Sequence, residues 1–193
     1  MLFMDSIEEL PRRHAITVDE YARMGEAHIF AQNARLELME GEIVEMAPIG
    51  SAHAAVVNIL DALLGELAPR AIVSVQNALV LNERSAPQPD VVLLRGRADW
   101  YYASRPTPGD VLLVVEVADT TLRYDLQVKR PLYARAGIAE LWVVDLDRRA
   151  IHVLLQPEGG KYSIHRILTG SDTVTVAALA GIGFAVSSLF PIG

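Results

Sequence analysis

Three short stretches decide the fold of this chain, and they read PDVVLL at residues 89–94, VLLVVEV at residues 111–117 and RYDLQVKR at residues 123–130. The first two are apolar runs typical of buried strands. Each of them nevertheless carries one carboxylate, Asp90 or Glu116. Because an unpaired charge is costly to remove from water, two such strands in succession indicate that the carboxylates share a partner. A divalent metal ion is the partner that serves both.

The third stretch predicts a helix that starts near Arg123 and ends at Gly137, since glycine is favoured just beyond a helix C-terminus. Leu122, Leu126, Lys129 and Tyr133 follow helical spacing, which places Lys129 on the stripe that faces the sheet. A lysine there needs an anionic partner once its ammonium leaves water. Placed near the proposed metal site, Lys129 would find such a partner there.

Together these residues predict a metal-dependent hydrolytic site. The carboxylates of Asp90 and Glu116 are hard oxygen ligands that suit Mg²⁺ or Mn²⁺. Lys129 beside such an ion would orient a water or stabilise the charge on a phosphate. Two simpler alternatives stay open: Glu116 and Lys129 form only a buried ion pair, or Asp125 and Lys129 form only a helix salt bridge.

The composition is that of a globular protein with one substantial core. The chain has 193 residues, of which 51% are hydrophobic and 21% charged, and it contains no cysteine. The absence of cysteine excludes a disulfide scaffold and every thiolate metal site. No signal peptide is recognisable near the N-terminus, and residues 174–186 are too short to span a bilayer. We expect a soluble, cytoplasmic protein with no membrane partner.

The charge is unevenly distributed along the chain. The formal net charge is −7, which by itself argues against a nucleic-acid partner. Up to Glu66, twelve acidic residues face four basic ones, whereas between Arg84 and Arg135 eight basic residues face six acidic ones. The region of the candidate site is therefore slightly basic, which permits a phosphate to approach without predicting strong non-specific binding to a duplex.

The remaining patterns complete an α/β domain with a mixed sheet flanked by helices. Thr17 and Glu20 form a capping box that starts a helix reaching about Gln32. A hairpin is expected at residues 35–46, with its turn near Glu40 and Gly41. A helix is expected at residues 51–67, with an apolar stripe of Ala55, Ile59, Leu63 and Leu67, and Pro69 ends it. Strands are expected at residues 71–81, 89–94, 111–117, 139–145, 150–155 and 161–168. The last three are strands joined by antiparallel hairpins.

One domain is expected over residues 1–193, with a helical segment at 1–33, a core at 34–170 and a C-terminal extension at 171–193. The long connection at residues 95–110 contains Trp100, Tyr101 and Tyr102. Loop packing over the core or a dimer contact is the favoured interpretation of these aromatic residues, and base stacking is the alternative. Trp142 is expected in the core, and His53, in the first turn of the helix at 51–67, is not counted among the site residues.

The chain resembles the Uma-two family of restriction-endonuclease-like proteins, a branch of the PD-(D/E)XK nuclease superfamily. The matching pieces are LELMEGEIV at residues 36–44, His53, QPDV at 88–91, VVEV at 114–117, YD at 124–125, Lys129, Tyr133 and GIAELWVVD at 137–145. The resemblance covers nearly the whole chain, and the last run is its most specific part.

The resemblance implies a metal-dependent endonuclease fold in which Asp90 and Glu116 are catalytic metal ligands. Glu37 resembles the additional upstream acidic residue of the superfamily, and Asp125 is a second accessory candidate. Ala118 departs from the pattern, because the superfamily places a lysine there. In this branch the lysine is taken to have moved to the following helix, which assigns the catalytic role to Lys129. A homodimer is also implied.

Two functions of different classes follow. The first is a Mg²⁺- or Mn²⁺-dependent endonuclease that hydrolyses phosphodiester bonds in DNA. The second is a non-catalytic relative that uses the same fold to bind nucleic acid or protein, and Ala118 and the acidic net charge motivate it. The joint presence of Asp90, Glu116 and Lys129 favours the enzyme, since a decayed site would be expected to lose one of them.

Overall fold

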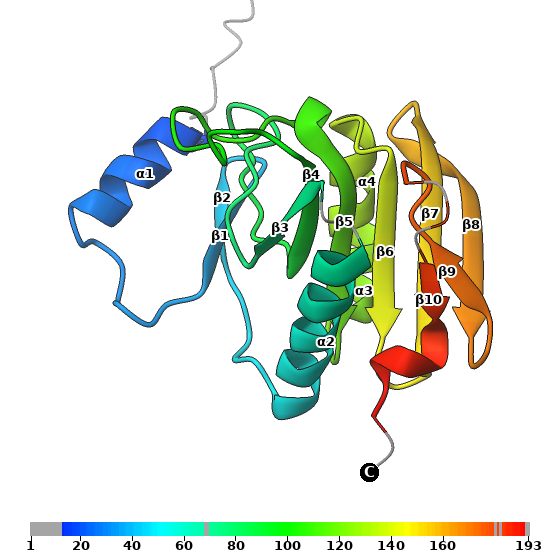
Figure 1. Ribbon diagram of the computed structural model, residues 1–193. Helices are drawn as coiled ribbons and strands as arrows, with labels where there is room; N and C mark the ends of the chain where they lie inside the picture. Colours follow the sequence, from blue (N-terminus) through cyan, green and yellow to red (C-terminus); the bar gives the residue numbers. More distant parts are fainter. Residues whose placement is uncertain (1–12, 68–69, 180, 182, 192–193) are drawn as a thin grey trace, which may run out of the picture.

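A six-stranded sheet forms the centre of the molecule (Figure 1). The computed structural model describes residues 13–67, 70–179, 181 and 183–191. The strands lie in the order β3-β4-β5-β6-β7-β8. Their bounds are β3 (Ala71–Val75), β4 (Val91–Arg95), β5 (Val111–Ala118), β6 (Glu140–Asp145), β7 (Ala150–Glu158) and β8 (Lys161–Thr169). The β5–β6 pair is parallel and all others are antiparallel, which confirms the predicted mixed sheet.

β5 is the central strand that its continuous apolar run predicts, because all eight of its residues are buried. Its alternate side chains point to opposite faces of the sheet and enter two separate hydrophobic clusters. Val115 and Val117 belong to the cluster under α2, whereas Val114 and Ala118 belong to the cluster under α4 (Arg130–Arg135). By the same alternation Glu116 points to the α4 face, where Lys129 and Tyr133 lie.

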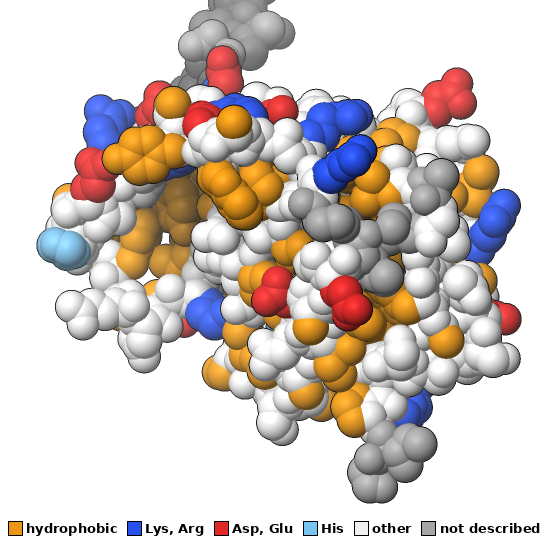
Figure 2. Space-filling view, in the orientation of Figure 1, with side chains coloured by type: hydrophobic (Ala, Val, Ile, Leu, Met, Phe, Trp, Pro, Cys, Tyr) orange, Lys and Arg blue, Asp and Glu red, His pale blue; other side chains and the backbone are white. Residues whose placement is uncertain are grey.

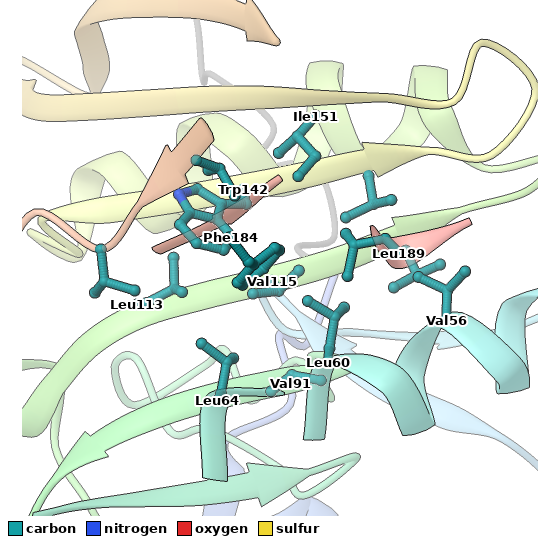
Figure 3. Close-up of a cluster of buried hydrophobic side chains, with 14 of the residues drawn as sticks. Val56, Leu60, Leu64, Val91, Leu113, Val115, Trp142, Ile151, Phe184 and Leu189 are labelled. Carbon is teal, nitrogen blue, oxygen red and sulfur yellow. The ribbon is translucent and has the colours of Figure 1, made fainter. Parts of the chain in front are cut away.

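Helix α2 (Ser51–Leu67) packs in front of the sheet in the view of Figure 1, and α4 lies behind it. The predicted stripe of α2 is displaced by one residue. Ala55, Ile59 and Leu63 are only half-buried. Pro69 and the side chain of Leu67 lie outside the described part of the chain. The fully packed face of the helix consists of Val56, Val57, Leu60 and Leu64. Figure 3 shows three of these side chains against Val91, Val115 and Leu189.

The N-terminal helix α1 (Val18–Glu26) begins as predicted, with Thr17 and Glu20 forming a capping box. It ends six residues earlier than predicted. His28 adopts a left-handed conformation, and the amides of His28 and Ile29 return to the carbonyls of Gly25 and Met24. This bonding pattern closes a helix and prevents its continuation to Gln32. Part of the expected helical segment, residues 1–12, lies outside the described residues.

The hairpin of β1 (Leu36–Met39) and β2 (Glu42–Glu45) is confirmed. It turns at Glu40 and Gly41, which both have positive φ, as a two-residue hairpin turn requires.

The strand predicted at residues 71–81 is wrong beyond Val75, where β3 ends. The amide of Gln76 still donates to the carbonyl of Asp90, but its φ of 51° then turns the chain out of the sheet.

The helix predicted from Arg123 to Gly137 contains a π-helical turn. It consists of α3 (Leu122–Tyr124), the π segment η2 (Asp125–Lys129) and α4, and Gly137 follows the end with a φ of 76°. Pro131 has no amide hydrogen for the carbonyl four residues earlier, and its ring crowds that carbonyl. The amide of Arg130 bonds to Asp125 across five residues. Asp125 and Lys129, the first and last residues of this π turn, are both buried.

The remaining elements close the core. They are η1 (Pro108–Asp110), β9 (Thr173–Thr175), β10 (Gly183–Ala185) and η3 (Val186–Leu189). Trp142 is fully buried, as predicted, and meets the ring of Phe184 edge to face (Figure 3). Within the ranges that the structure describes, no helix is long and apolar enough to cross a membrane.

The connection between β4 and η1 packs only Tyr101 of its three aromatic residues against the core. Trp100 and Tyr102 are 72% and 96% exposed. Tyr101 is half-buried beneath the guanidinium of Arg97 and lines a groove of about 650 Å³ between α1 and the edge strand β3. Figure 2 shows hydrophobic side chains in the hollow beside α1. The interpretation of core packing is therefore wrong for Trp100 and Tyr102.

Candidate active site

The five residues that the sequence singled out line one small pocket. Glu37 comes from β1, Asp90 from the residue before β4, Glu116 from β5, and Asp125 and Lys129 from the π-helical turn. The pocket measures about 70 Å³, which is room for a few water molecules or for one ion with some of its hydration shell. We call it the carboxylate pocket. All five side chains are buried within it.

Asp90 is held as an anion by donors from three separate segments of the chain. Its Oδ2 accepts the amide of Val117 at 2.8 Å and lies 3.0 Å from Nε2 of His53, and its Oδ1 accepts the amide group of Gln76 at 3.3 Å. Burial acts to raise the pKa of Asp90. The bonds from His53, Val117 and Gln76 outweigh it, so the pKa lies below the usual value. Asp90 is therefore a charged, oriented ligand.

Glu116 is held by donors from η2 and α4. Its Oε1 accepts the hydroxyl of Tyr133 at 2.6 Å and the ammonium of Lys129 at 3.1 Å. Oε2 accepts no hydrogen bond from the described part of the chain. Burial raises the pKa of Glu116 well above its usual value, Lys129 opposes this, and Asp125 among other carboxylates adds to it. Because both hydrogen bonds are made to Oε1, Oε2 is available to a cation, whose positive charge would favour the ionised carboxylate.

Lys129 is the cation of this cluster. Only 2% of it is exposed, and its Nζ donates to Oε1 of Glu37 at 3.0 Å as well as to Glu116. Burial acts to lower the pKa of Lys129, but Glu116, Glu37 and Asp125 outweigh it and raise the pKa. Lys129 therefore remains an ammonium, which is a donor and a positive charge and not a general base.

The helix salt bridge between Asp125 and Lys129 does not form among the described residues. Asp125 instead accepts the hydroxyl of Thr121 at 2.7 Å. Burial raises the pKa of Asp125 to about 6, an effect that Lys129 and Thr121 reduce. The buried ion pair between Glu116 and Lys129, which was the other alternative, does form. Glu37 contacts the same ammonium.

The donor set fits a hard divalent cation. Four buried carboxylates meet in the pocket with one ammonium, and Oε2 of Glu37 is buried with no hydrogen-bond partner in the described chain. No group of three or more acidic, histidine or cysteine side chains within the described residues is arranged to hold an ion alone. An ion bound by Asp90 and Glu116 would therefore complete its shell with water, which is the usual arrangement for Mg²⁺.

Sequence reasoning missed three members of the site. His53 is not among the predicted site residues, although it lines the pocket and touches Asp90. Tyr133 shares the helical stripe with Lys129, and this spacing is a signal that could have assigned it to Glu116. Gln76 has no signal, because it reaches Asp90 only through the left-handed turn that ends β3.

The Tyr133→Phe variant tests the support of Glu116. It removes one hydroxyl from a fully buried ring and leaves the packing unchanged. We expect urea unfolding to show a loss of about 1.5–3 kcal/mol, the range for hydrogen bonds to charged groups. The exposed Tyr102 provides the control, because Tyr102→Phe should leave the unfolding free energy unchanged within about 0.5 kcal/mol. Equal stability of wild type and Tyr133→Phe would contradict the assigned bond.

A mixed sheet that carries a carboxylate at the start of one strand, a second carboxylate in the next strand and a lysine in the following helix defines a restriction-endonuclease-like protein. The chain belongs to the Uma2 family, described as "Putative restriction endonuclease", whose model matches residues 18–187. No curated protein sequence matches the chain.

A solved structure has the same fold. It is the crystal structure of a putative nuclease belonging to DUF820 from Anabaena variabilis, with a TM-score of 0.67 and 16% sequence identity. The match covers 91% of this chain and 97% of that one. At this identity the likeness establishes the fold, and together with the family it points to a restriction-endonuclease-like nuclease.

Proposed function

We propose that this protein is a Mg²⁺- or Mn²⁺-dependent endonuclease that hydrolyses phosphodiester bonds in DNA. The observation that carries the proposal is the meeting of Asp90 and Glu116 in one pocket, each fixed by its own donors. Burying four carboxylates around one ammonium costs stability unless the site has a use for that charge. A divalent cation and a phosphate are partners that would use it.

In this mechanism Asp90 and Glu116 hold the ion, and the other residues hold these two. A bound divalent ion supplies Lewis acidity toward water and toward the phosphoryl oxygen. Lys129 has three N–H donors and gives two of them to Glu37 and Glu116. The third has no acceptor among the described residues and is available to an attacking water or to the phosphate. Glu37 anchors the ammonium, and Asp125 adds negative charge beside it.

The second candidate function is a non-catalytic module that binds nucleic acid or protein. Ala118 favours it, because it stands at the end of β5 where the superfamily has its lysine. The position of Lys129 weakens this argument for the module. Its ammonium lies 3.1 Å from Glu116, although it comes from a different element than Ala118. The module predicts binding of DNA or protein that Glu116→Ala leaves unchanged.

The experiment that separates the two candidates is a nicking assay on supercoiled plasmid. The reaction contains Mg²⁺ or Mn²⁺ at low salt, because contacts to phosphate weaken steeply as salt rises. We expect relaxed and then linear plasmid with either ion, and none with EDTA. Intact plasmid in all lanes, together with no heat of Mn²⁺ binding in calorimetry, would favour the module.

We further propose that residues 1–193 form one nuclease domain and that it functions as a homodimer. The extension supports the first point, because Phe184 and Leu189 pack in the same cluster as Leu60 of α2. The resemblance and the hydrophobic content of 51% support the second. Light scattering coupled to gel filtration, which gives the mass of the eluting species, tests it.

A further inference from the structure

We propose that His53 is a positioning residue that fixes the Asp90 carboxylate for metal binding. The inference rests on the proposed function, since it concerns the same pocket. His53 lies in the first turn of α2, and its Nε2 is 3.0 Å from Oδ2 of Asp90. Its side chain is 12% exposed and lines the carboxylate pocket.

His53 is the donor that can be removed most selectively. Oδ2 of Asp90 also accepts the backbone amide of Val117, which only a proline in the central strand β5 would delete. The bond from Gln76 to Oδ1 is longer, at 3.3 Å. The backbone bond and the His53 bond converge on the same oxygen, so together they fix the rotation of the carboxylate and direct Oδ1 away from them. Without His53, Oδ2 would keep only the backbone bond and Oδ1 only the longer bond from Gln76, so the rotation of the carboxylate would be less restricted.

A purely structural role does not explain the choice of histidine. Nδ1 of His53 is buried and has no hydrogen-bond partner in the described chain. An unsatisfied buried polar atom costs about 1–3 kcal/mol. The neighbouring turns of α2 bury the apolar residues Val56, Val57 and Leu60, and a leucine at position 53 would avoid this cost. The histidine therefore serves the carboxylate that it touches.

The expected consequence is a change in metal affinity. Residues that orient metal ligands through a hydrogen bond typically contribute about 10–100-fold to affinity. His53→Ala deletes the bond to Asp90, whereas His53→Gln retains an N–H donor three bonds from Cβ, as in the imidazole Nε2. Alanine should therefore weaken metal binding, and glutamine should restore most of it.

The test is calorimetric titration of Mn²⁺ into the full chain. Wild type, His53→Ala, His53→Gln and the control Asn58→Ala, an exposed site on the same helix, are compared. We expect the dissociation constant of His53→Ala to rise at least about 10-fold. His53→Gln should stay within about 3-fold of wild type, and Asn58→Ala should equal it. The Mn²⁺ concentration for half-maximal nicking should shift by the same factors.

Every other outcome contradicts a specific assignment. Equal Mn²⁺ affinity of wild type and His53→Ala overturns the role of His53 and leaves the proposed function intact. A lower melting temperature of His53→Ala with unchanged affinity overturns that role as well, because it shows a structural contribution only. A wild type that binds no Mn²⁺ overturns the proposed function and this inference with it.

Discussion

The Glu116→Gln variant should lose cleavage by about 1,000-fold or more while it remains folded. The loss follows because charge stabilisation by a bound metal ion is worth several kcal/mol, and each 1.4 kcal/mol is tenfold in rate. Gln has the shape of Glu, and its carbonyl can still accept the hydroxyl of Tyr133. Lys129 keeps Glu37 at 3.0 Å, so no unpaired charge is created. Initial nicking rates and urea unfolding measure the two effects.

The control for this substitution is Glu158→Gln, which makes the same chemical change at an exposed position of β7. It should leave both the rate and the free energy of unfolding at the wild-type values. We expect Glu116→Gln to change the unfolding free energy by at most about 2 kcal/mol. Glu116→Ala should likewise abolish cleavage. Full activity in either Glu116 variant would remove Glu116 from the mechanism.

The Lys129→Met variant should lose about 3–5 kcal/mol of unfolding free energy. Removing one partner of a buried ion pair leaves an uncompensated charge, and here two carboxylates lose their cation at once. The side chains of Glu37 and Glu116 are only 3% and 4% exposed, so bulk water would solvate the two carboxylates poorly once the ammonium is gone. Nicking should also fall, because the N–H of the ammonium that is available to the water or the phosphate would be lost. Urea unfolding and plasmid nicking test the two expectations.

The chain contains a matched control for this variant. Lys161 is its other lysine and lies exposed in β8, so Lys161→Met should change stability by no more than about 0.5 kcal/mol. Adding Glu37→Gln to Lys129→Met should recover part of the loss, since it removes one of the two stranded charges. A loss below about 1 kcal/mol in Lys129→Met would mean that the ammonium does not hold these carboxylates.

Periodicity and residue chemistry were sufficient for the elements that dominate the core. The apolar run of β5 predicted a strand buried on both faces, and the stripe of Leu122, Lys129 and Tyr133 predicted a lysine facing the sheet. Both are local consequences of side-chain spacing, which the sequence displays directly. The capping box of α1 and the glycine beyond α4 marked helix ends for the same reason.

The features that the sequence did not predict depend on backbone geometry or on contacts between distant segments. Proline at 131 signals a disturbed helix, but periodicity does not distinguish a kink from the π-helical turn that the structure shows at Asp125–Lys129. The left-handed conformations of His28 and Gln76 end α1 and β3 at residues with no strong breaking tendency. His53 and Asp90 are 37 positions apart, so only the packing of α2 on the sheet brings them together.

The most direct test of the central claim is plasmid nicking by wild type and Glu116→Gln, purified in parallel and assayed with Mn²⁺ and with EDTA. The pairing is decisive because a contaminating nuclease would be present in both preparations. We expect that only wild type with Mn²⁺ nicks the plasmid. Equal nicking by both proteins, or nicking by wild type that persists in EDTA, would contradict a metal-dependent site built on Asp90 and Glu116.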